Sequence, residues 1–201
     1  MLIGSNAIAV APIANGGDAA VFVDVPAQWT ATAYRFVMTG SNDGVSDTTI
    51  PITSFQIRYS EATSYLSAII KGADAYVSEI EARSNGHLQI YRDYHYSDGT
   101  IVSALQIDVP YKDIMTQQGG MAGTTATITG QAAYSPSQAK TSDISDISYR
   151  SYAGGKRRLR CAIDPQVRVG DTVQTPTDSF VIGEVIFIIS ADTGIMELVE
   201  S

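Results

Sequence analysis

Both histidines of the chain lie in one tyrosine-rich segment, residues 87–96. Alternate residues of a β-strand share a face, so one side of this segment would carry His87, Gln89, Tyr91, Asp93 and His95. Such a row could bind a metal ion, and the tyrosines could stack on a sugar ring. However, side chains two residues apart on a strand point in parallel, and aromatic residues favour strands for other reasons. A surface or interface strand is therefore the preferred interpretation.

A basic run at residues 156–160 is the second candidate. With Arg150 and Arg168 it contains six of the chain's thirteen basic residues within nineteen positions. One face of such a strand would be charged, and the other would carry Leu159, Cys161 and Ile163. The charged face could be solvated, or it could dock on an acidic patch of a partner or neighbouring copy. The residues predicted to form a partner interface are Lys156, Arg157, Arg158, Arg160, Tyr91, Tyr94 and Tyr96.

Signatures of enzymes are missing from the sequence. It contains neither a Gly-x-Ser-x-Gly nucleophile elbow nor a Gly-x-x-x-x-Gly-Lys-Ser/Thr phosphate loop. The single cysteine, Cys161, excludes an intramolecular disulfide and is predicted to be an inert thiol in the core. The acidic loops lack the ligand spacing of a calcium-binding EF-hand. We therefore expect no catalytic, cofactor or metal site, and no enzyme.

Composition narrows the functional classes further. The chain has 201 residues, of which 44% are hydrophobic and 17% charged, so it can bury a core and is unlike a disordered protein. Its net charge of −8 opposes general binding to nucleic acid, because phosphate contacts require a basic face. The first 25 residues contain no Lys or Arg, unlike a signal peptide, and the apolar run 180–189 is too short to span a bilayer. No membrane association is expected.

The elements that would position these residues are mostly strands. Period-two alternation, as in Thr53, Phe55, Ile57 and Tyr59, predicts half-buried strands, and Ser97-Asp98-Gly99 predicts a hairpin turn. One helix is expected over residues 74–83, with Asp74 as N-cap and Arg83 facing away from the apolar stripe. The predicted strands cover residues 34–39, 53–59, 65–71, 88–96, 100–109, 124–134, 144–152, 156–163, 171–174, 180–189 and 195–199.

These elements predict a mainly β chain of one or two small antiparallel β-sandwich or barrel modules with one short α-helix. Residues 1–32 would form an extended arm or a strand pair, residues 33–134 a β-rich domain, and residues 143–201 a C-terminal β-module. The strand 180–189 is apolar on both of its alternating faces, which predicts burial of both. The second covering layer would come from the same barrel or from another subunit.

Two stretches resemble small virion proteins of tailed bacteriophages, over about residues 55–201. The first is Ser84 to Ile90 followed by Ser97-Asp98-Gly99. The second contains Ser148-Tyr149-Arg150, Lys156 to Cys161, Asp164-Pro165, Val169 to Val173, Phe180 to Gly183 and Met196-Glu197. This stretch looks like a short β-module of tail, neck or baseplate components. The resemblance implies a structural role and transfers no catalytic residue.

We therefore expect a structural component of a tailed-phage virion (tail, baseplate or neck), assembled in the host cytoplasm. It would work as a homo-oligomer, in the form of a ring, in contact with other virion proteins. A capsid decoration protein is a variant of this interpretation. A carbohydrate-binding or host-adhesion module remains an alternative and would stack sugars on Tyr91, Tyr94 and Tyr96. A hydrolase would need His87 or His95 within hydrogen-bond reach of an acid or hydroxyl in a cleft.

Overall fold

The computed structural model describes residues 29–40, 44–118, 123–136, 139–190 and 193–201. The protein is mainly β, as the sequence predicted. Of the expected N-terminal arm or strand pair, residues 1–28 lie outside the described residues, and residues 29–32 belong to the first strand. The strands are β1 (Trp29–Met38), β2 (Thr48–Thr49), β3 (Ser54–Ser60), β4 (Thr63–Lys71), β5 (His87–Tyr96), β6 (Ile101–Gln118), β7 (Thr124–Ala133), β8 (Thr141–Asp143), β9 (Ile147–Ala153), β10 (Lys156–Cys161), β11 (Thr172–Gln174), β12 (Ser179–Ser190) and β13 (Gly194–Glu200).

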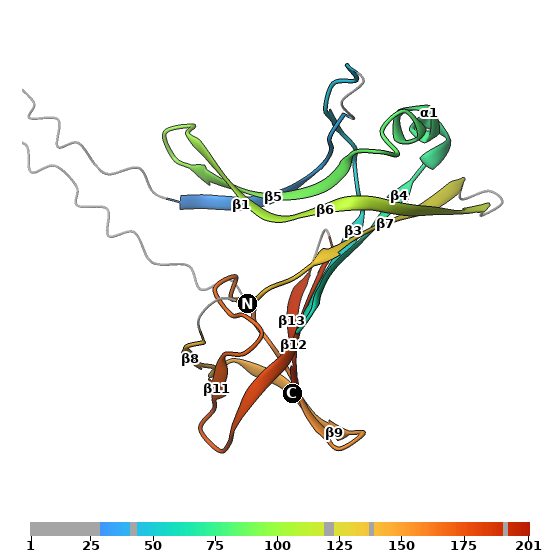
Figure 1. Ribbon diagram of the computed structural model, residues 1–201. Helices are drawn as coiled ribbons and strands as arrows, with labels where there is room; N and C mark the ends of the chain where they lie inside the picture. The colour runs from blue at the N-terminus through green and yellow to red at the C-terminus, as the bar shows by residue number, and fades with distance from the viewer. Residues whose placement is uncertain (1–28, 41–43, 119–122, 137–138, 191–192) are drawn as a thin grey trace, which may run out of the picture.

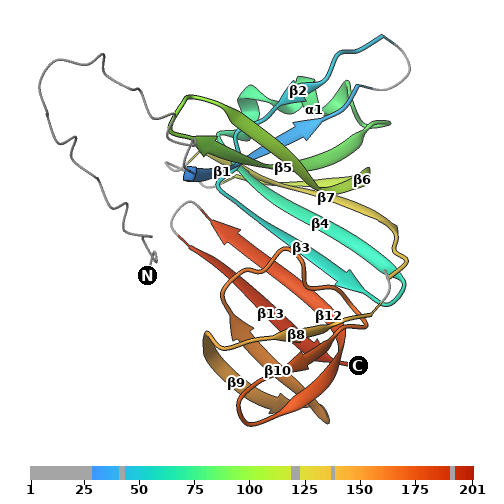
Figure 2. The same cartoon turned by 90° about the vertical axis from the view of Figure 1, so that its left-hand side faces the viewer.

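The strands form one strongly curved sheet (Figures 1 and 2). Its order is β2-β1-β5-β6-β7-β4-β3-β12-β13-β10-β9; in addition, β11 pairs with β12, and β8 pairs with β11. All pairings along this path are antiparallel, and β8 and β11 pair in parallel. The upper part in Figure 2 contains β1 to β7, and the lower part contains β8 to β13. The two parts are joined because β3 pairs with β12 from Ser54 to Ser60.

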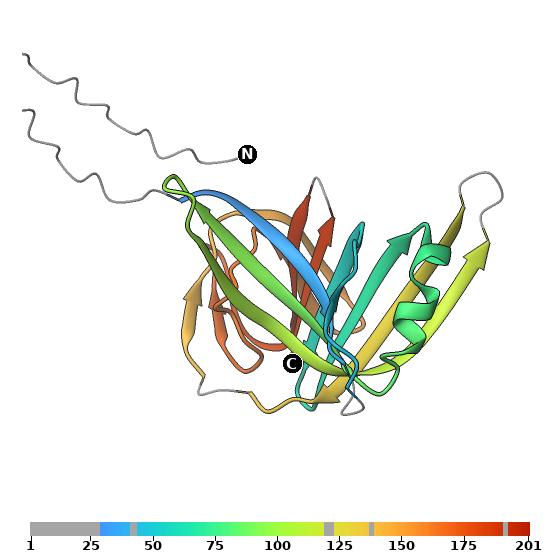
Figure 3. The ribbon, with the colours of Figure 1, turned by 90° about the horizontal axis from the view of Figure 1, so that it is seen from above.

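One hydrophobic core runs through both parts on the concave side of the sheet. The buried cluster extends from Phe36 and Leu88 in the upper part, through Ile57 and Phe187 at the junction, to Leu198 in the lower part. Figure 3 shows from above how the strands curl around this interior. The curvature explains how a single sheet covers its own apolar face.

The hairpin β5–β6 forms as the turn sequence predicted. Gly99 has a φ of +83°, a conformation that favours glycine, and the backbone N–H of Thr100 donates to the carboxylate of Asp98 at 2.8 Å. Hydrogen bonds from Thr100 also hold the pKa of Asp98 below its ordinary value. The strand β6 is longer than expected. It pairs with β5 up to Pro110 and with β7 from Tyr111, so its first half extends the β1–β5 part of the sheet and its second half extends the β7–β4 part.

The prediction of a helix over residues 74–83 is wrong in the length of the helix and in the exposure of Arg83. A 3-10 turn, η1 (Ala73–Ala75), follows Gly72, whose φ is +65°, and the α-helix α1 covers only Val77–Glu81. Its Ile80 is buried, as the apolar stripe required. Arg83, however, is buried rather than exposed. Its guanidinium donates to the carbonyl oxygens of Ser46 and Glu79 and to the Glu79 carboxylate, which supply the partners that a buried charge needs.

Burial of both faces of the strand 180–189 is also wrong. Phe180, Ile182, Val185, Phe187 and Ile189 are buried, whereas Val181 and Ile188 are exposed. The register of β12 shifts between Ile182 and Glu184, so the alternation changes phase there. A strict alternation over the whole strand therefore places buried residues on both faces. With the change of phase taken into account, β12 buries one face.

Candidate protein-protein interface

A continuous row of polar contacts covers the convex face of β1, β5 and β6. His87 Nδ1 lies 2.7 Å from Asp108 Oδ1, and Gln89 Nε2 donates to the other oxygen of Asp108 at 3.0 Å. The Tyr91 hydroxyl donates to Gln89 Oε1 at 3.0 Å. His87, Gln89 and Tyr91, which the sequence placed on one face, thus do share it, and together with Asp108 they form a line of contacts along the strand. A line of exposed contacts is typical of a sheet surface.

Arg35 and Asp93 continue this row toward the hairpin tip. Arg35 Nε donates to Asp93 Oδ2 at 3.1 Å, and the Ser103 hydroxyl donates to Asp93 Oδ1 at 2.6 Å. Burial by itself would raise the pKa of Asp93, but the bonds from Arg35 and Ser103 outweigh it and hold the pKa below its ordinary value. The Arg35 guanidinium also lies 4.7 Å from the centre of the Tyr91 ring. Asp93 is therefore an ionised, structurally engaged carboxylate.

The three candidate tyrosines of β5 divide between its two faces. Tyr91 lies with Arg35 on the convex face. Tyr94 lies on the opposite face, where the Arg92 guanidinium is 5.0 Å from its ring centre and 5.9 Å from that of Tyr34. Tyr96 shares the face of Tyr94 by alternation. The set cannot form one flat platform, which removes the feature that a sugar-stacking site required.

The two hypotheses that involve the histidines, a metal site and a hydrolase, both require side chains that converge in an enclosed site. Within the described ranges, no group of three His, Cys, Asp or Glu side chains is placed to hold a metal ion. His87 does contact an acid, Asp108, but the two side chains are 48% and 39% exposed on the sheet. The pair therefore lies outside the enclosed cleft that the hydrolase alternative required.

Large apolar side chains are exposed at the tip of the β5–β6 hairpin. Ile101, Val102 and Leu105, called here the tip patch, are 55%, 49% and 49% exposed. The hairpin projects from the upper part of the molecule in Figure 1. Ile101 pairs with His95 and Val102 with Tyr94, so their side chains lie on opposite faces of the hairpin. Exposed aliphatic side chains on both faces favour contacts with other proteins.

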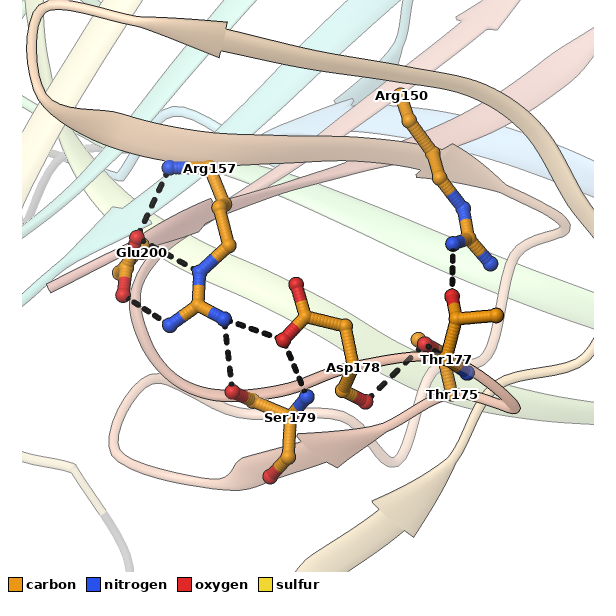
Figure 4. A network of polar contacts seen from close by, with 7 residues as sticks. All are labelled: Arg150, Arg157, Thr175, Thr177, Asp178, Ser179 and Glu200. Carbon is orange, nitrogen blue, oxygen red and sulfur yellow. Dashed lines mark hydrogen bonds and ion pairs between the residues drawn. The ribbon is translucent and has the colours of Figure 1, made fainter.

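The basic run forms β10, where each arginine contacts acidic residues of the same chain. Arg157 donates from its backbone N–H and from Nε to Glu200 Oε2, at 2.9 and 3.0 Å, and its guanidinium also pairs with Asp178. A further bond reaches the carbonyl oxygen of Ser179 at 3.0 Å. Figure 4 shows this network, in which β10, the end of β13 and the loop before β12 meet.

These contacts shift the protonation of the network. Hydrogen bonds from Arg157 lower the pKa of Glu200 to about 2 and also lower that of Asp178, and they raise the pKa of Arg157. The network therefore carries fixed charges at neutral pH. Arg157 serves as a clamp within the lower part of the molecule.

Arg158 and Arg160 share one carboxylate on the face opposite the core. Both contact Glu197 of the adjacent strand β13, at 3.3 and 2.8 Å. Arg160 also lies 5.4 Å from the ring centre of Tyr149 on β9. Lys156 is exposed and forms no ion pair among the described residues. The four basic residues predicted for an interface therefore lie together, with three of them bound to acids; their contact with a partner stays a prediction.

The edge strand β9 presents aromatic residues beside this basic strand. It pairs with β10 alone and ends the main path of the sheet. Tyr149 and Tyr152 are 52% and 72% exposed. Sequence reasoning missed both tyrosines and the tip patch as interface residues, although two tyrosines within one predicted strand are a usable signal. It also missed Glu197 and Glu200, because cross-strand partners that lie about forty residues away leave no local pattern.

Cys161 lies where its alternation predicted. It is buried in the core, and burial raises the pKa of its thiol to about 11, so the thiol stays protonated at neutral pH. In the part of the chain that the structure describes, every helix is too short or too polar to cross a membrane.

Three solved structures similar to this chain have related descriptions. One is a tail protein from Neisseria meningitidis, with 8% identity, a TM-score of 0.47, and coverage of 83% of this chain and 95% of that chain. Another is the 43 kDa tail protein of prophage MuSo2 from Shewanella oneidensis, with 6% identity, a TM-score of 0.46, and coverage of 83% and 96%. The structures are those of tail proteins.

A third similar structure is the E. coli c3393 protein, a component of the type VI secretion system described as structurally similar to the T4 bacteriophage tail proteins gp27 and gp5. It has 5% identity and a TM-score of 0.45, and the match covers 85% of this chain and 76% of that chain. All three descriptions name tail proteins, the class that the sequence resembles. No family model and no curated protein matches the sequence. We therefore infer the function of this chain from the residues exposed on its own surface.

Proposed function

We propose that the protein is a structural component of a tailed-phage virion, in its tail, baseplate or neck. It works as a homo-oligomer, a ring, which assembles in the host cytoplasm and contacts other virion proteins. The observation that carries this proposal is the exposure of large apolar and aromatic side chains at two separate places, the tip patch and β9. Two separate surfaces with exposed apolar side chains on one subunit are typical of a protein that binds several neighbouring subunits.

The role is one of binding and not of catalysis. His87 and Asp108, the pair nearest to acid-base chemistry, lie on an open sheet surface. The arginines of β10 are already bound to carboxylates, so they offer little to the phosphates of a nucleic acid. Protein surfaces that combine tyrosine, arginine and aliphatic residues are typical of protein-protein contacts.

Quantitative mass spectrometry of purified phage particles tests the proposal. Tails separated from heads should contain the protein in a constant ratio to the other tail proteins, and infection extracts should contain it in the same assemblies. Its absence from particles, or its presence only on heads, would overturn the assignment to tail, baseplate or neck. The second result would favour a capsid decoration protein.

A further inference from the structure

We propose that the open edge of β9 accepts residues 18–25 of a neighbouring copy as an added strand. The inference rests on the proposed assembly role and names the contact that joins one subunit to the next. A strand added to a sheet edge gains main-chain hydrogen bonds, and its side chains gain specificity from pockets and charges beside the edge.

The edge of β9 is suited to such pairing. In the described part of the chain, β9 has a neighbour on one side only. Charged residues, especially lysine, and proline commonly protect an edge, and the seven residues of β9 contain one charged residue, Arg150, and no lysine or proline. Tyr149 and Tyr152 stand on its two faces and are largely exposed. An added strand would cover aromatic surface on both sides of the sheet.

The charges of the two segments are complementary. The strands β9 and β10 carry Arg150, Lys156, Arg157, Arg158 and Arg160. Among the described residues, three carboxylates, those of Asp178, Glu197 and Glu200, form ion pairs with them, while Arg150 bonds to the neutral hydroxyl of Thr177. Residues 1–28 contain no basic residue, and their only charges are Asp18 and Asp24. An acidic strand therefore suits the basic edge better than a neutral or a basic strand would.

The sequence of residues 18–25 fits a strand. Between the two aspartates it reads Ala-Ala-Val-Phe-Val, and Val25 and Pro26 follow. Valine and phenylalanine favour strands, and a proline at the end stops the pairing. One face of the strand would carry Val21, Val23 and Val25.

Residues 18–25 are too far from β9 of the same chain to pair with it, so the added strand comes from another copy. Only residues 26–28 separate it from Trp29, the first residue of β1. Three extended residues reach about 10 Å, or about two strand spacings. Figures 1 and 2 place β1 in the upper part and β9 at the lower end, with several strands between them. A donor at one end and an acceptor at the other make a head-to-tail contact, which closes into a ring when the rotation permits.

The test uses full-length chains and light scattering behind size exclusion. Val23→Pro disables the donor, and Tyr152→Glu with Lys156→Glu disables the acceptor. Each should weaken subunit association at least about tenfold. The matched controls are Val10→Pro in the same N-terminal segment, and Met115→Glu with Lys71→Glu, which makes the same change in charge at exposed positions of β6 and β4. Both controls should keep the wild-type mass.

Mixing the two disabled variants decides whether the strand is exchanged. The donor of the β9 variant can still enter the edge of the Val23→Pro variant, so an equimolar mixture should form a one-to-one heterodimer that neither variant forms alone. Unchanged far-UV circular dichroism shows that each variant is folded. A monomeric wild type, an oligomer that both variants leave intact, or a mixture without heterodimer would overturn the exchange. None of these results bears on the virion role, which is tested separately by mass spectrometry of phage particles.

Discussion

Arg157 gathers more partners than any other residue of the basic run. It binds Glu200 at the end of β13, Asp178 in the loop before β12, and the carbonyl oxygen of Ser179, the first residue of β12. Because its bonds lower the pKa of Glu200 from 4.5 to about 2, the folded protein binds a proton at Glu200 more weakly than the unfolded chain does. This contribution to stability is complete above pH 4.5 and is lost as the pH falls toward about 2.

Glu200→Gln should therefore flatten the acid dependence of stability. The variant should be less stable than wild type at pH 7, and the two free energies of unfolding should converge between pH 4.5 and about 2. Urea unfolding at a series of pH values measures this difference. Glu61→Gln, in the exposed turn between β3 and β4, is the control and should give a curve parallel to wild type. A Glu200→Gln curve that is also parallel would contradict the role of the pair.

At the scale of elements, the passage of β6 from β5 to β7 depends on one glycine. Gly130 of β7 lies against the point where β6 changes partner, called here the β6 bend. A Cβ atom at Gly130 would lie 2.6 Å from Val109 Cγ2 and 2.8 Å from the Pro110 carbonyl oxygen. Both distances are shorter than a methyl group tolerates, and the second involves backbone that cannot easily move. The bend brings the hairpin with the tip patch into place.

Gly130→Ala should destabilise the fold by about 1–3 kcal/mol, the range for overpacking a dense site. The bend should open slightly, so amide exchange of β5 and β6 should accelerate more than that of β10. Chemical denaturation and hydrogen exchange measure the two effects. Ala133→Val, at the exposed end of β7, adds volume without such a clash and should change stability little. Equal effects of the two substitutions would show that the close approach at Gly130 is unimportant.

At the scale of the whole molecule, the two parts share a sheet and a core. Phe187 on β12 is buried at the junction, and its ring centre lies 6.3 Å from that of Tyr59 on β3. The Tyr59 hydroxyl donates to the Gln106 carbonyl oxygen at 2.7 Å, and burial raises the pKa of Tyr59 to about 12. The junction thus contains buried apolar contacts and a hydrogen bond between strands, which favour cooperative unfolding of both parts.

Phe187→Ala should lower the stability of both parts together, by about 3–5 kcal/mol. Differential scanning calorimetry should give one transition at a lower temperature, and amide exchange should accelerate equally in β5 and β10. The neighbouring Ile188→Ala, on the exposed face, is the control and should have a small effect. Two transitions, with only the one of residues 143–201 shifted, would show that the parts unfold separately.

Local pattern was sufficient for most of the strands. The alternation of Phe55 and Ile57 marked β3, Ser97-Asp98-Gly99 marked the hairpin, and Cys161 was placed in the core by its neighbours. These features depend on residues a few positions apart, and the backbone and solvent impose the same rules on them in any protein. The mainly β class and the shared face of His87 and Asp93 follow for the same reason.

Tertiary structure alone decided which side chains meet. The bulge at Gly183 changed the buried face of β12, Ser46 and Glu79 drew Arg83 into the interior, and Glu197 and Glu200 took the arginines of β10. Most of these partners are about forty residues apart in sequence, so their meeting depends on strand order and register. Local periodicity contains no information on either, because each is set by the packing of the whole sheet on its core.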